Sequence, residues 1–290
     1  MDQENFITLR DSRRLGYALF GSPSLKDVVF YFHGFPGSRL EVGFAHEAAL
    51  HAGITLIGLD RPGFGLSTDY PSRQILAWPS DVLEAADVLA IQKFSILGIS
   101  GGTPYALACA LKIPDRIRRV AVVSGLGSVE IPGALPQMNF FNRQMLHMAA
   151  KVPFAARLLV GRLTKALHKH PQAMIRWLMT VSPPSDKVIL KRPDVRRILA
   201  DNFREGLRGG GAGIAHELAL IARPWGFSPK DISLPVLLWH GTADDYVPLC
   251  MGQYHSRVIP GCQSHFVEDG GHFMVISLID EILAKLKASS

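Results

Sequence analysis

Short, continuous runs of apolar residues alternate with amphipathic stretches through the first 124 residues of the chain. The apolar runs have the length of strands and span residues 28–32, 54–59, 94–97 and 119–124. Stretches with helical periodicity lie between them, at about 42–52, 79–91 and 104–111. Strands that are apolar along their whole length and are separated by helices predict a parallel sheet covered on both faces.

The alternation is preceded by two short strand patterns and is later interrupted. Residues near 7–9 and 16–20 predict antiparallel strands at one edge of the sheet. From about 130 to 230 the periodicity is helical and predicts no strand. After Pro235 the alternation resumes, with strands at 236–240 and 264–268 and helices at about 248–258 and 272–287. The chain is therefore predicted to form a mostly parallel eight-stranded α/β core from residues 1–128 and 233–290, with an inserted helical cap at 129–232.

One stretch of the predicted cap has a clear amphipathic pattern. Apolar side chains share one helical face at Leu158, Leu159, Leu163, Ala166 and Leu167, and basic ones lie mostly elsewhere, at Arg157, Arg162, Lys165 and Lys169. Other apolar side chains of the cap could line an acyl pocket or pack its helices on the core: Met138, Phe140, Phe141, Met145, Met148, Trp177 and Met179.

Charge is distributed unevenly along the chain. Residues 128–234 carry 16 Lys and Arg against 7 Asp and Glu, which gives +9, whereas the rest carries 15 against 18, which gives −3. A solvated basic face is the simplest interpretation. Steering of anionic substrates or contact with an acidic surface are the alternatives. No aromatic and basic motif of a nucleic-acid-binding module is present, so we expect no nucleic-acid partner.

Composition indicates a globular protein. The sequence is 48% apolar and 19% charged, which supports a large core. No apolar run approaches the roughly 18 to 20 residues of a spanning helix. The start of the chain is polar and acidic, and three scattered cysteines form neither a disulfide framework nor a zinc site. We therefore expect a cytoplasmic protein with no integral membrane segment. The oligomeric state is not predicted.

Residues 98–102, with the sequence Gly-Ile-Ser-Gly-Gly, match the pattern G-x-S-x-G between a predicted strand and a predicted helix. In that setting Ser100 lies at a tight turn that exposes its hydroxyl, and the flanking glycines leave room for the turn. A serine hydroxyl needs a nearby base and a group that orients the base. The pattern predicts Ser100 to be a nucleophile.

Two loops later in the chain offer the base and its orienting acid. His272 follows the last predicted strand, at the carboxyl edge of the sheet where open α/β sheets place their sites. Asp244 follows the previous strand and is the predicted acid, with Asp245 as the alternative. The backbone N–H groups of Phe35 and Gly101 are the expected oxyanion donors. His33 is expected to brace its loop.

Five motifs in order resemble the α/β-hydrolase superfamily: HGFPGS at 33–38, DRPGFGLS at 60–67, GISGG at 98–102, HGTADDYVP at 240–248 and GGHF at 270–273. Within it the chain is similar to capped bacterial serine hydrolases, which include carboxylesterases, lactonases and proline iminopeptidases. The resemblance implies a Ser100–Asp244–His272 triad, a small-molecule acyl substrate and no cofactor. The serine argues against haloalkane dehalogenases and epoxide hydrolases, which carry Asp at this position.

Other patterns in the sequence carry no predicted chemistry. His46 and His51 are five residues apart, so they face different sides of a helix and do not form a zinc site. The glycine run at 209–213 lacks the Lys and Ser/Thr of a phosphate-binding loop, and is expected to be a cap loop or hinge. An acyltransferase on the same triad and a non-catalytic binding protein of this fold remain alternatives to hydrolysis of an ester.

Overall fold

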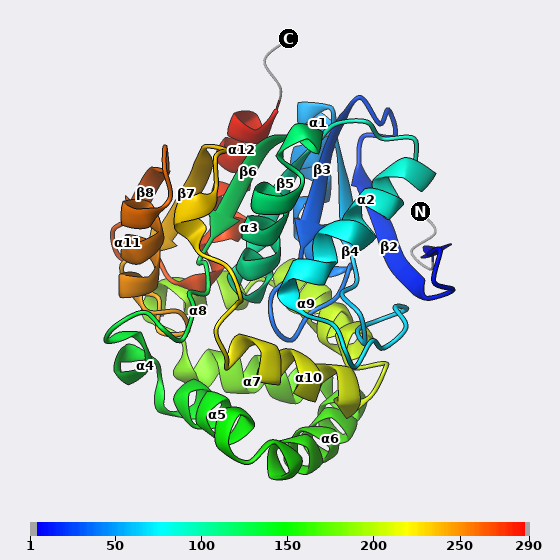
Figure 1. Cartoon of the computed structure of the whole chain (residues 1–290). Helices are drawn as coiled ribbons and strands as arrows, with labels where there is room; N and C mark the ends of the chain where they lie inside the picture. Colours follow the sequence, from blue (N-terminus) through cyan, green and yellow to red (C-terminus); the bar gives the residue numbers. More distant parts are fainter. Residues whose placement is uncertain (1–4, 288–290) are drawn as a thin grey trace.

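The computed structural model describes residues 5–287 and centres on one eight-stranded sheet (Figure 1). The strands are β1 (Asn5–Thr8), β2 (Arg14–Gly21), β3 (Asp27–Phe32), β4 (Ile54–Leu59), β5 (Phe94–Ile99), β6 (Ile117–Val123), β7 (Val236–Gly241) and β8 (Gln263–Val267). Their spatial order is β1-β2-β4-β3-β5-β6-β7-β8. Strands β3 to β8 run parallel, and β1 and β2 pair antiparallel at one edge. The predicted fold class is confirmed.

Helices cover both faces of the sheet, which is why its central strands are apolar along their length. Every residue of β4, β5 and β7 is buried. One face is covered by α1 (His46–Ala52) and α12 (Val275–Leu286), and the other by α2 (Trp78–Val88), α3 (Thr103–Lys112) and α11 (Leu249–Val258). A short 3-10 helix, Glu41–Ala45, precedes α1 within the stretch predicted as one helix.

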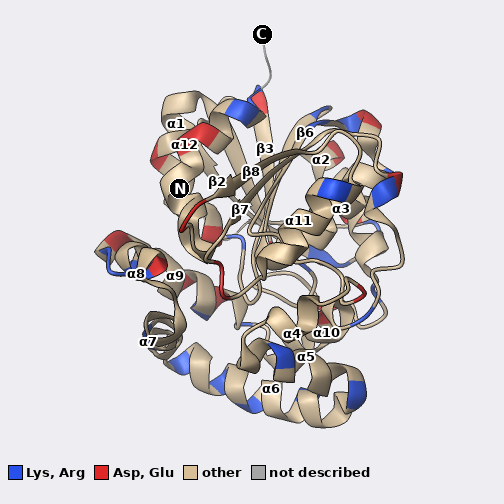
Figure 2. Cartoon of the chain, turned by 90° about the vertical axis from the view of Figure 1, so that its left-hand side faces the viewer, with Lys and Arg blue, Asp and Glu red and all other residues tan. Residues whose placement is uncertain are grey.

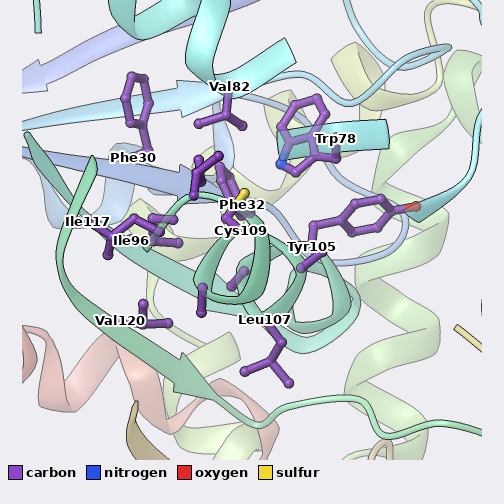
Figure 3. Packing of buried hydrophobic residues seen from close by; sticks show 14 of the residues in the cluster. Phe30, Phe32, Trp78, Val82, Ile96, Tyr105, Leu107, Cys109, Ile117 and Val120 are labelled. Atoms are coloured by element: carbon purple, nitrogen blue, oxygen red, sulfur yellow. The ribbon is translucent and has the colours of Figure 1, made fainter. Parts of the chain in front are cut away.

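The larger core cluster lies between the sheet and helices α2 and α3 (Figure 3). Phe30 and Phe94, from β3 and β5, meet edge to face at 4.7 Å between ring centroids. Trp78 of α2 lies between Phe32 and Tyr105. Because α3 begins at Thr103, directly after the short 3-10 helix Ser100–Gly102, this packing fixes the turn at the end of β5 relative to the sheet.

Seven α-helices lie between β6 and β7, where the sequence predicted a helical insertion. They are α4 (Ala134–Gln137), α5 (Phe140–Lys151), α6 (Pro153–Lys169), α7 (Pro171–Val181), α8 (Pro184–Leu190), α9 (Pro193–Gly206) and α10 (Gly211–Ile221). Figure 1 places them below the carboxyl ends of the strands. The glycine run is only partly a loop, because α10 already begins at Gly211.

The face through which α6 packs is not the leucine-rich face that its apolar pattern indicates. Its buried residues are Ala156, Val160 and Thr164. Leu158 and Leu159 are 52% and 48% exposed. The helix therefore packs through small and β-branched side chains and leaves these leucines at the surface.

Candidate active site

The predicted Phe35, Ser100, Asp244 and His272 all follow carboxyl ends of strands in the parallel part of the sheet. Phe35 lies in the loop after β3, Ser100 directly follows β5, Asp244 follows β7 and His272 follows β8. Ligands of open α/β sheets bind at this edge.

Ser100 occupies a strained turn between β5 and α3. Its φ of +52° lies in the left-handed region that L-residues rarely adopt. The turn is tight because the chain packs closely on both sides: a Cβ at Gly102 would overlap the carbonyl of Phe32, and one at Gly98 would lie 2.7 Å from the Cβ of Ala106. Glycine at these two positions allows the backbone to turn beneath the serine.

Asp244 and His272 form a hydrogen-bonded pair. Asp244 Oδ2 accepts a hydrogen bond from His272 Nδ1 at 2.8 Å, and Asp244 Oδ1 accepts from the backbone N–H groups of Tyr246 and Val247, each at 2.9 Å. Both carboxylate oxygens are therefore satisfied, and among residues 5–287 the ring Nε2 has no hydrogen-bond partner. Asp245 is exposed, so the structure brings Asp244 rather than Asp245 to the histidine.

The pair perturbs the pKa of both groups. Burial alone would raise the pKa of Asp244, but the His272 ring outweighs it and lowers that pKa below its usual range. Burial alone would lower the pKa of His272, but the charges of Asp244, Asp186 and Glu41 raise it above its usual value. An ionised Asp244 beside an imidazole of raised basicity suits a general base.

Within the described residues 5–287, the Ser100 hydroxyl and the His272 ring form no hydrogen bond with each other. Such bonds are often long in unliganded enzymes and shorten in the complex with substrate. The side chain of His272 is 12% exposed, so it is accessible from the site.

The loop after β3 brings the Phe35 amide to the turn at Ser100. A Cβ at Gly101 would lie 3.3 Å from the Phe35 nitrogen, and one at Gly34 would lie 3.7 Å from the Ser100 Cβ. Within the described part of the chain the Phe35 N–H has no hydrogen-bond acceptor. It is therefore available to an oxygen that binds between the two loops.

Three side chains fix the backbone of Gly34, and with it the orientation of the Phe35 N–H. The Gly34 carbonyl accepts hydrogen bonds from Arg61 Nη2 at 2.9 Å and from His33 Nδ1 at 2.8 Å, while the Gly34 N–H donates to Glu41 Oε2 at 2.9 Å. The Gly34 carbonyl and the Phe35 N–H belong to one trans peptide group, so they point in opposite directions. Anchoring the carbonyl on Arg61 thus directs the N–H away from Arg61.

His33 serves this loop as a neutral group. A carbonyl can only accept, so Nδ1 carries the proton and Nε2 accepts from the Arg61 backbone N–H at 3.3 Å. Burial, together with the charge of Arg61, lowers the pKa of His33 well below its usual value. Both ring nitrogens are occupied by backbone groups, so His33 braces the loop.

A buried carboxylate of the helical insertion holds Arg61 in place. Glu217 of α10 is fully buried and accepts from Arg61 Nε, Arg73 Nη2 and the Tyr105 hydroxyl, each at 2.7 Å. Burial alone would raise the pKa of Glu217, but the two arginines outweigh it and lower that pKa. A second link joins Glu205 of α9 to the Arg39–Asp60 pair through Arg39 Nη1 at 2.7 Å.

The backbone of His272 is also fixed from outside its own loop. Asp186 of α8 is fully buried and accepts from the N–H groups of His272 at 2.8 Å and Phe273 at 2.9 Å. Ser124, at the end of β6, donates its hydroxyl to the His272 carbonyl at 3.1 Å. The insertion thus contributes a carboxylate to each side of the site, Glu217 behind the Phe35 loop and Asp186 behind the histidine.

These supporting residues were not predicted from the sequence. Arg61 lies in the motif at 60–67, so that motif was a signal that its loop matters for the site. Asp186 and Glu217 stand in helices with no local pattern that marks them. Their partners are 86 and 156 residues away along the chain, and only the packing of the insertion brings them together.

Other features of the described residues add no second reactive centre. His46 accepts from the Gly21 N–H, and His216 contacts the Arg73 carbonyl. Within residues 5–287 no group of three or more His, Cys, Asp or Glu side chains is arranged to hold a metal ion. In the same range no helix is long and apolar enough to cross a membrane.

Comparisons with known proteins agree with this fold. A family model described as the alpha/beta hydrolase fold matches residues 27–277. Epoxide hydrolase B of Mycobacterium tuberculosis is 28% identical over 114 residues, which are 37% of this chain. The match spans about a third of that protein's length (32%).

Solved structures of similar fold cover nearly the whole chain. A hydrolase from Pseudomonas aeruginosa PA01 is 18% identical with a TM-score of 0.70, and the match covers 97% of both chains. The enol-lactonase from Burkholderia xenovorans LB400 is 20% identical with a TM-score of 0.68, again over 97% of both chains. At such identities the likeness shows the fold alone.

Proposed function

Because the chain belongs to the α/β-hydrolase family, we propose that it is a serine hydrolase that cleaves a carboxylic ester or a related acyl bond through an acyl-enzyme. The observation that carries the proposal is the hydrogen-bonded Asp244–His272 pair at the same sheet edge as Ser100. Ser100 attacks the acyl carbon, and His272 takes its proton and passes it to the leaving group. Asp244 orients the ring and stabilises the imidazolium.

The oxyanion formed in this attack would accept hydrogen bonds from the backbone N–H groups of Phe35 and Gly101. The unsatisfied Phe35 N–H supports this role. Water then cleaves the acyl-enzyme with His272 as the base. The segment 129–232 acts as a cap over the site in this proposal, with Asp186 and Glu217 as its links to the catalytic loops.

Acidic side chains of the cap support an ester rather than a peptide substrate. A prolyl peptidase needs carboxylates that face the free amine of its substrate. Asp186 and Glu217 are fully buried, on backbone amides and on two arginines, and Glu205 pairs with Arg39. Of the other cap carboxylates, Asp194 and Asp201 pair with arginines at the surface.

The elbow residue separates this proposal from epoxide hydrolysis, the activity named for the Mycobacterium tuberculosis relative. An epoxide hydrolase of this family attacks with a carboxylate, and this chain has Ser100 there. We therefore expect no turnover of epoxides such as styrene oxide.

A panel of p-nitrophenyl esters of graded acyl length, with lactones and prolyl-naphthylamide alongside, tests the substrate class. We expect ester turnover that is lost in Ser100→Ala, together with labelling of wild type by a fluorophosphonate. Hydrolysis of prolyl-naphthylamide alone would overturn the ester assignment. Absence of labelling would support the non-catalytic alternative, and transfer of the acyl group to an added alcohol in preference to water would support the transferase.

The identity of the acid has its own matched test. Asp244→Asn removes the charge beside His272, so we expect it to lower kcat by orders of magnitude, as in other triads. Asp245→Asn changes an exposed neighbour and should leave most activity. The opposite ranking of the two variants would assign the role to Asp245.

A further inference from the structure

The helical insertion carries an unusual combination of charge and exposed apolar surface. Between Ile131 and Ser185 there are seven Lys and Arg residues and no Asp or Glu. Among the described residues, eight of the fourteen exposed large hydrophobic side chains fall in this same stretch: Phe140, Phe141, Val152, Phe154, Leu158, Leu159, Leu163 and Val181. Isolated exposed apolar residues are ordinary on protein surfaces, but this concentration is not.

Helix α6 carries both basic and exposed apolar side chains along one face. The residues opposite its buried face recur at helical spacing and are all exposed: Phe154, Leu158, Arg162, Lys165 and Lys169. We call these five residues the outer stripe of α6. Phe154 is 74% exposed and Leu158 is 52% exposed, with Leu159 and Leu163 beside them. Figure 2 shows blue and no red along α6, which lies at the end of the molecule furthest from the sheet.

Carboxylates around α6 either pair with arginines or lie on the side of the helix that faces the core. Asp201 and Glu205, on α9, pair with Arg204, Arg208 and Arg39. Asp69 lines a cavity of about 170 Å³ with Arg157, on the side of α6 that faces the core. None of the five residues of the outer stripe is acidic, so no carboxylate within the stripe neutralises its basic charge.

We propose that the outer stripe of α6 docks on an anionic lipid surface. An interfacial helix places Phe and Leu at the boundary between headgroups and acyl chains while Lys and Arg meet the lipid phosphates. The long stems of Arg162, Lys165 and Lys169 let their charges reach the headgroups while Phe154 and Leu158 insert. The 17 residues of α6 span about 25 Å, which is enough to lie along the interface.

Charge complementarity favours this partner over a second copy of the chain. A symmetric dimer through the same face would place two basic surfaces against each other. Anionic headgroups instead attract each basic residue, at about a fivefold gain in binding per residue near the surface. The proposal does not depend on the hydrolase chemistry, because none of the five residues contacts the triad.

Vesicle flotation measures the docking directly. Ser100→Ala protein serves as the background so that hydrolysis cannot alter the lipid, and wild type should bind equally. We expect binding to vesicles of equal parts phosphatidylglycerol and phosphatidylcholine, little binding to phosphatidylcholine alone, and loss of binding as NaCl rises. Binding that is equal on both vesicles, or absent from the anionic ones at low salt, would overturn the proposal.

Two double variants separate the charged and apolar parts. Arg162→Glu with Lys165→Glu should weaken binding by about 30-fold or more. Phe154→Ser with Leu158→Ser should weaken it by about tenfold or more, since two apolar side chains no longer insert. The matched control is Lys93→Glu with Lys112→Glu, which makes the same charge change at exposed positions of the core and should leave binding within about twofold.

The remaining outcomes decide against the proposal. Losses as large in the core control would show that net charge, not the stripe, governs binding. A wild-type dimer in gel filtration that becomes monomeric in the Phe154→Ser, Leu158→Ser variant would make the stripe an interface between copies. Unchanged thermal melting of every variant, together with unchanged ester hydrolysis by the same substitutions made in protein that keeps Ser100, would show that the fold is intact.

Discussion

Arg61 is the residue for which the structure most directly predicts an effect on catalysis that needs no contact with the substrate. Its guanidinium donates to Glu217, to the His33 carbonyl and to the Gly34 carbonyl. In Arg61→Lys, one ammonium replaces a planar fork and cannot make all three bonds in their present directions. We expect the Gly34–Phe35 peptide group to lose its fixed orientation, and the Phe35 N–H with it.

The expected loss of kcat in Arg61→Lys depends on the contacts that still hold the Gly34 carbonyl in the variant. Loss of one oxyanion donor costs about 10²- to 10³-fold in kcat, or about 2.7–4 kcal/mol. The hydrogen bond from His33 Nδ1 to the Gly34 carbonyl, 2.8 Å long, does not involve the Arg61 side chain, so we expect the N–H to be misdirected only part of the time in the variant. We therefore expect kcat to fall about 10- to 100-fold, with KM changed less than about threefold, because the donor acts on charge that develops in the transition state.

Arg73→Lys is the matched control. Arg73 shares Glu217 and is buried beside it, but it donates to the Tyr105 hydroxyl instead of the loop carbonyls. Both variants should lower the free energy of unfolding by a similar amount, measured in urea. Only Arg61→Lys should lower kcat on p-nitrophenyl esters and slow fluorophosphonate labelling. Equal losses of kcat in the two variants, or a fully active Arg61→Lys, would refute the reasoning.

Three further predictions use other contacts of the insertion. His272 must be neutral to accept a proton and its pKa is raised, so kcat/KM should rise with pH through a midpoint above 6.5. Asp186→Asn removes one of the charges that raise the pKa of His272 and should lower this midpoint. An unmoved midpoint would exclude the charge effect. Glu217→Gln leaves two buried arginines poorly compensated and should cost about 3–5 kcal/mol in urea unfolding; a loss under about 1 kcal/mol would contradict this. Gly213→Ala places a Cβ about 2.6 Å from backbone atoms of a core loop and should lower the free energy of unfolding by about 1–3 kcal/mol. A Cβ at Gly161 has no neighbouring atom within 4 Å, so Gly161→Ala should stabilise α6 by up to about 1 kcal/mol. The reverse order in thermal melts would contradict the packing.

Local pattern predicted the elements that carry the reacting groups. The strands ending before Phe35, Ser100 and Asp244 are recognisable from sequence because strands buried on both faces are apolar throughout, whereas β8, which ends before His272, is an edge strand that is only partly buried. Their parallel arrangement then places all four residues at one edge. The roles of the four residues stay predictions until the variants above are assayed.

Contacts between distant segments could not be predicted in the same way. Asp186 and Glu217 sit on helices whose pattern fits many packings, and neither position differs locally from a solvated acidic residue. The pattern around Leu158 was misleading for a related reason. Hydrophobic periodicity identifies a helix but does not say which face packs, and here the smaller side chains of Ala156 and Val160 allow close approach to α10.

The buried carboxylates of the insertion bear on how such an enzyme could be altered by exchange of parts. Removing residues 129–232, or replacing them with the helices of another hydrolase, would strip Glu217 from Arg61 and Arg73 and leave these two buried guanidinium groups without their carboxylate, and Arg39 would keep Asp60 but lose Glu205. It would also free the His272 backbone from Asp186. A chimera would therefore need these three carboxylates transplanted at matching positions, whereas the outward surfaces of α5, α6 and α7 could be rewritten without touching the catalytic loops.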